Sequence, residues 1–203
     1  MSPCMKILAG LSMCLLLLAF PPATKAEQSG AYLGEMVMGS DDAPVTIIEY
    51  ASMSCSHCAS FHSATLPSLK KKYIDSGKLR MVFREFAYDR TGFAAATLAR
   101  CAGKKRFFPF VKLLFEKQRQ WALSEDYGAA LKQIAKVGGI GSKKYDACMA
   151  DAKLKSHILN NRIDAQKKYD IKATPSFIID GETHAGALTI GDFDRLLAGL
   201  TGE

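Results

Sequence analysis

The sequence predicts an α/β protein in which a β-α-β unit and a later β-β-α unit are separated by an all-helical insertion. The apolar run "PVTIIEY" and the alternating run "LRMVFREF" are typical of strands, and a helical pattern lies between them. Residues 91–170 then keep a helical spacing of apolar residues throughout. The following segment "PSFIIDGETHAGAL" has the pattern of a hairpin around an Asp-Gly turn.

The first 26 residues have the three parts of a secretory signal peptide. Lys6 precedes the apolar run 7–20, two prolines follow that run, and Thr-Lys-Ala supplies small residues for cleavage. A permanent membrane anchor is the alternative, but the run is shorter than the about 20 residues that a bilayer span needs. We therefore expect residues 1–26 to be removed on export, together with Cys4 and Cys14, and the mature chain to be periplasmic.

The mature chain has the size of one domain and is only mildly basic. About 177 residues remain, enough for a core that needs no disulfide support. The leader carries two lysines and no acidic residue, so its removal lowers the formal charge from +7 to +5. The remaining lysines are scattered along helical stretches without interleaved aromatic residues, as on a solvated surface. We therefore expect no nucleic-acid partner.

The first unit contains a strand at 45–50, a helix, and a second strand at 79–86. Its first strand is a nearly continuous β-branched run, as expected for a strand buried on both faces. Apolar residues then recur at helical spacing as far as Gly77, and Pro67 should kink this helix in its middle.

The helical insertion, residues 91–170, has several separate apolar faces, and glycines interrupt it near 138–141. Four residues near its end, Ile158, Ile163, Gln166 and Tyr169, indicate a longer final helix that leads back to the sheet.

The chain then returns to the sheet. We expect strands at 177–179 and 184–188 and a closing helix that starts at Asp192. The order of elements assigns residues 27–90 and 171–203 to one domain.

Cys55 and Cys58 lie where the first strand turns into the helix. At the helix N-cap, Cys55 would be exposed and would face unpaired N–H groups and the positive end of the helix dipole, which favour its thiolate. Cys58, one turn further, would be the resolving thiol. His57 adds a hydrogen-bond donor or partial positive charge beside the sulfurs. A stabilised thiolate makes the disulfide form a strong oxidant, so the pair predicts a dithiol oxidase.

Other roles for the pair are a structural staple and a metal site. A disulfide that closes a two-residue loop restricts the unfolded chain little and is a poor staple. A metal site would need a second pair of ligands. His62 is the nearby candidate, and we expect it to be a surface residue of the helix. A thiol-based metal-binding or peptide-binding chaperone stays open as an alternative function.

The segments "IEYASMSCSHCASFH" and "ATPSFIIDG", together with the helical insertion, resemble the exported oxidases of the DsbA type over nearly the whole mature chain. The resemblance implies a thioredoxin fold, in which residues 27–90 and 171–203 form the thioredoxin-like domain. It implies a cis bond between Thr174 and Pro175, which turns the Thr174 backbone toward the sulfurs so that an extended substrate can pair with it. It also implies that Glu49 is a buried carboxylate that carries the proton of Cys58.

The resemblance also implies the partners. Unfolded or partly folded exported proteins would be the substrates, and a quinone-linked membrane oxidase of the DsbB type would re-oxidise the protein without any cofactor or metal in this chain. A disulfide isomerase or reductase is the alternative within this fold. Those enzymes carry an N-terminal dimerisation domain, for which residues 27–44 are too few, so we expect a monomer. Ser56-His57 departs from the Pro-His of many relatives, which leaves the oxidising strength open.

Cys101 and Cys148 are the other cysteines of the mature chain, and each falls on a helix of the insertion. In an oxidising compartment we expect them to form a structural disulfide that encloses 46 residues and stabilises the fold by about 2 to 4 kcal/mol. A pair of buried free thiols is the alternative.

Overall fold

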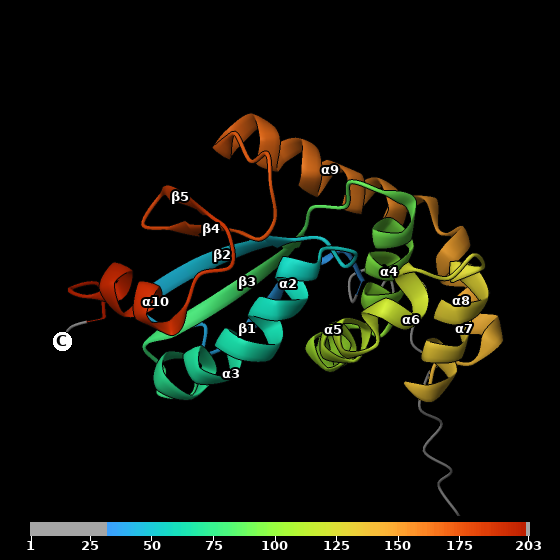
Figure 1. The fold of residues 1–203 in the computed structure, drawn as a ribbon, viewed down its shortest axis with the longest axis horizontal. Helices are drawn as coiled ribbons and strands as arrows, with labels where there is room; N and C mark the ends of the chain where they lie inside the picture. The colour runs from blue at the N-terminus through green and yellow to red at the C-terminus, as the bar shows by residue number, and fades with distance from the viewer. Residues whose placement is uncertain (1–31, 202–203) are drawn as a thin grey trace, which may run out of the picture.

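The computed structural model describes residues 32–201, so the expected signal peptide with Cys4 and Cys14 lies outside the described residues. The described chain forms one five-stranded sheet in the order β1-β3-β2-β4-β5, with helices on both faces (Figure 1). The strands are β1 (Met36–Met38), β2 (Val45–Ala51), β3 (Leu79–Glu85), β4 (Ser176–Ile179) and β5 (Glu182–Ala185). β2 and β3 run parallel and the other neighbours antiparallel. The predicted α/β architecture with a helical insertion is confirmed.

The helix between β2 and β3 is divided by wide turns instead of a single kink. It comprises α2 (Ser56–Ser60), a π-helical turn (Phe61–Thr65), α3 (Leu66–Leu69) and a second π-helical turn (Lys70–Ile74). Pro67 lies in the first turn of α3, where its missing N–H costs least. The N–H of Leu66 bonds to the carbonyl of Phe61, five residues back. The first wide turn therefore inserts one extra residue into the helix after Phe61.

The two faces of the sheet are covered by different helices. One face packs on the divided helix and on α10 (Ile190–Leu197), and the other packs on α9 (Ala152–Tyr169), which crosses above the sheet in Figure 1. The first face gathers Ile47, Leu69, Phe177 and Phe193. The second gathers Tyr50, Phe86, Ala165 and Ile178.

The remaining helices form a block beyond the end of β2 (Figure 1). They are α4 (Arg90–Cys101), a short 3₁₀ turn (Lys104–Arg106), α5 (Phe107–Glu116), α6 (Gln118–Ala122), α7 (Tyr127–Val137) and α8 (Ser142–Ala150). The largest apolar cluster joins this block to the sheet and includes Cys55, Cys58 and Trp121. The cysteine pair therefore lies at the seam between the two units. No helix among residues 32–201 has the length and apolar character needed to cross a bilayer.

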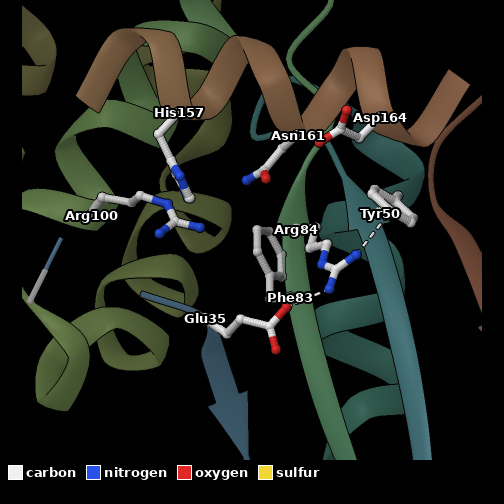
Figure 2. A pocket seen from close by; sticks show the side chains of 8 residues that line it. All are labelled: Glu35, Tyr50, Phe83, Arg84, Arg100, His157, Asn161 and Asp164. Carbon is white, nitrogen blue, oxygen red and sulfur yellow. Dashed lines mark hydrogen bonds and ion pairs between the residues drawn. The ribbon is translucent and has the colours of Figure 1, made fainter. Parts of the chain in front are cut away.

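A buried ion pair fastens several elements at this seam. Nε and Nη2 of Arg100 donate to the two carboxylate oxygens of Glu85 at 2.6 and 2.9 Å, and both side chains are 1% exposed. Nη1 of Arg100 donates to the carbonyls of Tyr32 and Gly34, so α4 holds β3 and the segment before β1 together. The side chains of Arg100 and His157 line the same cavity of about 220 Å³ (Figure 2). Burial and the charge of Arg100 lower the pKa of His157.

The predicted long final helix is confirmed as α9, whose 18 residues lead back to the sheet, although not all the residues that indicated it lie inward. Ile163 is 43% exposed and Gln166 is also exposed. The residues that point inward are Leu154, Ile158 and Ala165. Asn161 lies on this inward stripe and donates to Glu85 at 2.7 Å. Because a polar residue fills an inward position, residue type alone does not show which side of this helix faces the core.

Three elements, β1, β5 and α10, also differ from the prediction. β1 was not predicted, because its three residues are too few to show a period and follow a polar stretch. The Asp180-Gly181 turn is confirmed, with φ of 48° and 81°, but this two-residue turn starts β5 at Glu182 instead of 184. α10 begins before Asp192, which completes a capping box with Thr189.

Candidate active site

Cys55 is the N-cap of α2, at the end of the loop that follows β2. Its Sγ accepts a hydrogen bond from the backbone N–H of Cys58 at 3.3 Å, and its own N–H donates to the carbonyl of Ser52 at 3.1 Å. Its expected exposure was wrong, because only 6% of Cys55 is accessible. The helical block and the loop before β4 cover the sulfur, so a partner can approach it only from a narrow direction.

The two sulfurs, which are not bonded to each other in this structure, have opposite acidities. The side-chain hydrogen bond from Cys58 is the largest cause that lowers the pKa of Cys55, to about 5, and it outweighs burial of the sulfur. A side-chain hydrogen bond of Thr174 and the backbone N–H groups of Cys58 and His57 act in the same direction. Burial, followed by the effects of Cys55 and Glu49, raises the pKa of Cys58 far above its ordinary value. Cys55 is therefore a thiolate at neutral pH, while Cys58 keeps its proton.

His57 contributes to this asymmetry through its backbone N–H. Its side chain is exposed, where water screens any charge that it carries. The imidazole that we expected to act beside the sulfurs therefore faces solvent.

The peptide bond between Thr174 and Pro175 is cis. The carbonyl of Thr174 lies 3.3 Å from the Sγ of Cys55 and accepts the proton of its thiol form. The loop before β4 thus presents main chain directly beside the nucleophile, as the sequence resemblance implied.

Glu49 and His62 form a buried pair on the other side of Cys58. Both carboxylate oxygens of Glu49, on β2, lie close to Nε2 of His62, at 2.9 and 3.1 Å. Glu49 is fully buried, and its partner is the imidazole of His62. The expectation for His62 was wrong, because its side chain is only 5% exposed. His62 lies four residues after Cys58 on the inward side of the helix, against the ring of Phe115 at a centroid distance of 4.6 Å.

Two further polar groups hold the loop in place, and sequence reasoning missed both. Nε2 of Gln118, on α6, donates to the carbonyls of Met53 at 2.8 Å and Cys55 at 2.9 Å, and Gln118 is only 8% exposed. Asp89 caps α4 by accepting the N–H of Gly92 at 2.7 Å and also accepts the hydroxyl of Ser54. An Asp before a helical run is a recognisable N-cap signal. Nothing in the sequence marks Gln118.

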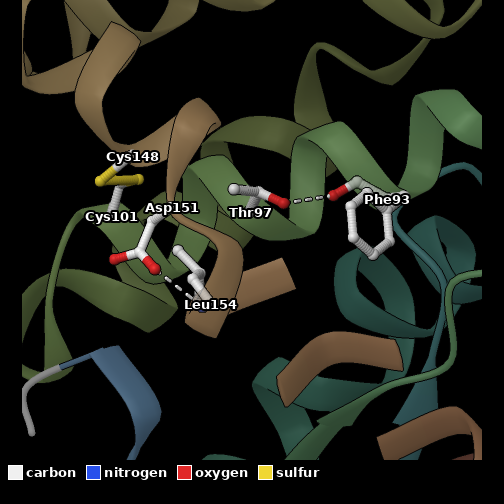
Figure 3. The surroundings of a disulfide bond; sticks show 6 residues. All are labelled: Phe93, Thr97, Cys101, Cys148, Asp151 and Leu154. Carbon is white, nitrogen blue, oxygen red and sulfur yellow. Dashed lines mark hydrogen bonds between the residues drawn. A yellow bond between two sulfur atoms is a disulfide. The ribbon is translucent and has the colours of Figure 1, made fainter. Parts of the chain in front are cut away.

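Cys101 and Cys148 are joined by a disulfide in the structure, and their Cα atoms are 6.0 Å apart. The bond ties the C-terminal end of α4 to α8 and lies above Leu154 of α9 (Figure 3). The two cysteines are 0% and 5% exposed. A thiol reagent in solution therefore has little access to this bond.

A metal site at the cysteine pair would require several ligand side chains gathered around one point. Across residues 32–201, no group of three or more His, Cys, Asp or Glu side chains is placed to hold a metal ion. His62 is paired with Glu49, and His57 faces solvent.

A family model described as thioredoxin matches residues 32–198. A Rickettsia bellii protein whose name assigns it to the protein-disulfide oxidoreductases is 35% identical over 148 residues, 72% of this chain. The chain spans 57% of the length of that relative. Disulfide bond formation protein D of Bacillus subtilis is 28% identical over 171 residues, which cover 80% of this chain and 74% of that protein.

Solved structures are also similar to this chain. The crystal structure of Wolbachia pipientis α-DsbA1 superposes with a TM-score of 0.76 at 30% identity, covering 92% of this chain and 94% of that one. Oxidised BdbD from Bacillus subtilis shares the fold, with a TM-score of 0.74 at 22% identity over 83% of this chain and 94% of that one.

Proposed function

This chain belongs to the thioredoxin family, among its DsbA-type thiol:disulfide oxidoreductases, and we propose that it is a periplasmic dithiol oxidase. It would donate the Cys55–Cys58 disulfide to exported proteins as they fold. The observation that carries this proposal is the difference in acidity between the two sulfurs. A thiolate that is stable at neutral pH favours the reduced form, and a pair that prefers to be reduced oxidises its partners.

The exchange proceeds in two displacements. A substrate thiolate attacks the Sγ of Cys55, the bond between Cys55 and Cys58 breaks, and Cys58 leaves with the electron pair and takes up a proton. A second substrate thiolate then attacks the substrate sulfur of this mixed disulfide, and Cys55 leaves as its stable thiolate. The substrate loses two electrons and the protein gains them. A quinone-linked oxidase of the DsbB type would remove them again.

The surroundings of Cys55 support an extended polypeptide as substrate. The main chain of Thr174 lies beside the sulfur and can pair with a strand of substrate. An open pocket of about 630 Å³ begins at the loop around Tyr88 and Asp89 and continues between α4 and α9. Asp89 contacts Ser54, the residue before Cys55. An unfolded chain that reacts at Cys55 can therefore lay its apolar side chains on an adjoining surface.

The redox potential of the Cys55–Cys58 pair tests this function. The protein is equilibrated in glutathione buffers of increasing ratio, and the fraction of thiolate at Cys55 is followed by ultraviolet absorbance. We expect a potential near about −120 mV, the range of strongly oxidising pairs of this fold. A potential near about −270 mV, typical of reductants, would contradict the proposal, and a value near about −180 mV would favour an isomerase.

A further inference from the structure

We propose that His62 is a positioning residue for the proton of Cys58. Its imidazole holds the Glu49 carboxylate in place behind the thiol and balances the negative charge there while the proton moves. This role rests on the proposed function in one respect, that Cys58 is the thiol that leaves and returns during exchange.

The geometry places the three groups in one buried cluster. His62 follows Cys58 by four residues along the same helical segment, and its Nε2 lies within 3.1 Å of both oxygens of Glu49. Cys58 is fully buried, and Glu49 raises its pKa. The imidazole therefore contacts the carboxylate, and the carboxylate acts electrostatically on the thiol.

A carboxylate inside an apolar core requires a partner. The ring of His62 contacts the rings of Phe61, Phe83 and Phe115, none of which ionises, and the ionisable group against it is Glu49. An unpaired charge in such surroundings is strongly disfavoured. An imidazole in contact with the carboxylate can carry the balancing positive charge or release it as a proton.

The proton balance of the exchange gives this pair a task. When the disulfide opens, Cys58 leaves as a thiolate in a site that disfavours its charge, so it takes up one proton. The pair of His62 and Glu49 supplies that proton, is left with one additional negative charge, and regains a proton from solvent. When Cys58 later attacks a mixed disulfide at Cys55, the pair first releases a proton to solvent and then accepts the proton of Cys58. A neutral side chain at position 62 keeps a hydrogen bond but removes the balancing charge.

The step that Cys58 performs can be measured separately. Reduced protein, with the buried Cys101–Cys148 disulfide left intact, is mixed with oxidised glutathione and quenched with acid. Mass spectrometry then separates formation of the Cys55–glutathione disulfide from its resolution by Cys58. For His62→Gln we expect resolution at pH 7 to slow about tenfold and its pH profile to shift to higher pH, with formation changed less than twofold. His184→Gln, a histidine substitution on the edge strand β5, is the matched control and should change neither rate.

A double variant distinguishes a role of His62 through Glu49 from a merely structural effect of the substitution. If His62 acts through Glu49, adding His62→Gln to Glu49→Gln should change the resolution rate less than twofold. Resolution at the wild-type rate and pH profile in His62→Gln, or a full tenfold further loss in the double variant, would overturn the proposal. Neither outcome depends on the redox potential, so a failure here is distinct from a failure of the proposed function.

The wild-type protein provides an independent measurement if His62→Gln does not fold. Nitrogen-15 spectra of the His62 imidazole should differ between the dithiol and disulfide forms between pH 5 and 9. Identical spectra in the two forms over this range would contradict a role in moving the proton of Cys58.

Discussion

The two cysteine pairs of this chain share a chemistry and differ in almost everything around it. Cys55 and Cys58 are three residues apart at the start of a helix, where one sulfur accepts hydrogen bonds and the other is buried beside a carboxylate. Cys101 and Cys148 are 47 residues apart on two helices, in an apolar cluster. Exposure does not separate the pairs, because all four cysteines are buried.

What separates the pairs is the stability of the reduced form. The thiolate of Cys55 is stabilised where it lies, so opening the first disulfide is favourable. Opening the Cys101–Cys148 disulfide would leave two thiols in an apolar cluster. It would also remove a restriction on the unfolded chain, which favours unfolding. The hydrogen bonds around a sulfur, more than its accessibility, therefore decide which disulfide reacts.

The largest expected contrast is in activity. Cys55→Ser removes the attacked sulfur and should lower the rate of oxidation of a peptide dithiol by at least about a thousandfold. Cys101→Ala with Cys148→Ala should keep this rate within about threefold of wild type, because neither residue contacts the site. Fluorescence of a dithiol peptide substrate measures both. Comparable losses in the two variants would contradict the division of roles.

When stability is measured instead of activity, the double substitution of Cys101 and Cys148 should have a larger effect than Cys55→Ser. Without the link between α4 and α8, we expect the free energy of unfolding to fall by about 2 to 4 kcal/mol, chiefly because the unfolded chain is less restricted. Urea denaturation followed by circular dichroism provides the measurement. Cys55→Ser, assayed in parallel, should lose less, and a change below about 0.5 kcal/mol in the double variant would argue against a structural role.

The acidity of Cys55 should make the two redox forms respond differently to pH. Because the folded pKa of about 5 lies below the ordinary value of 9.0, thiolate formation stabilises the folded reduced protein above about pH 5. This contribution is complete above pH 9.0 and is lost as the pH falls through about 5. At pH 7 it amounts to about 2 to 3 kcal/mol.

Unfolding free energies of the reduced and oxidised forms, measured from pH 4 to 8, check this expectation. The Cys101→Ala, Cys148→Ala background leaves one pair to change its redox state. The difference between the two forms should grow with rising pH. A constant difference, or a thiolate absorbance with its midpoint near 8.5, would show that Cys55 is an ordinary thiol.

The smallest effect is expected from the support of the loop. Gln118→Leu leaves the carbonyls of Met53 and Cys55 without their donor, which should cost about 1 to 3 kcal/mol of stability. We also expect the pKa of Cys55 to rise by about one unit as its N-cap position loosens. Gln120→Leu, an exposed position on the same helix, is the matched control. Equal ultraviolet titrations for the two variants would contradict a positioning role.

The sequence predicted those features that depend on residues close together in the chain. β2 and β3, the Asp180-Gly181 turn and the N-cap position of Cys55 each follow from a short local pattern. The family resemblance added the loop at Thr174 and Pro175, which no local pattern indicates. His62 lies four residues after Cys58 and four before Leu66, so helical spacing places it on their inward face. Its inward position was missed because a histidine was assigned to the surface by its residue type.

Contacts between segments that are far apart in the sequence could not be predicted either. Gln118 is 63 residues from the carbonyl of Cys55, and its meaning depends on how α6 approaches the loop. The orientation of Asn161 was not predicted for a related reason, since it occupies an inward position to reach Glu85. Polar residues that serve buried partners cannot be distinguished, by type alone, from polar residues on the surface.

The bond from Gln118 to the carbonyl of Cys55 also links reactivity to the order of synthesis. A chain emerging from its N-terminus carries both thiols of the pair long before α6 has been made. Until α6 packs against the loop, the carbonyls of Met53 and Cys55 lack their hydrogen-bond donor, and the start of α2 at Cys55 is not held in place. The geometry that makes Cys55 acidic is therefore complete only after the chain has been made as far as α6 and that helix has packed against the loop.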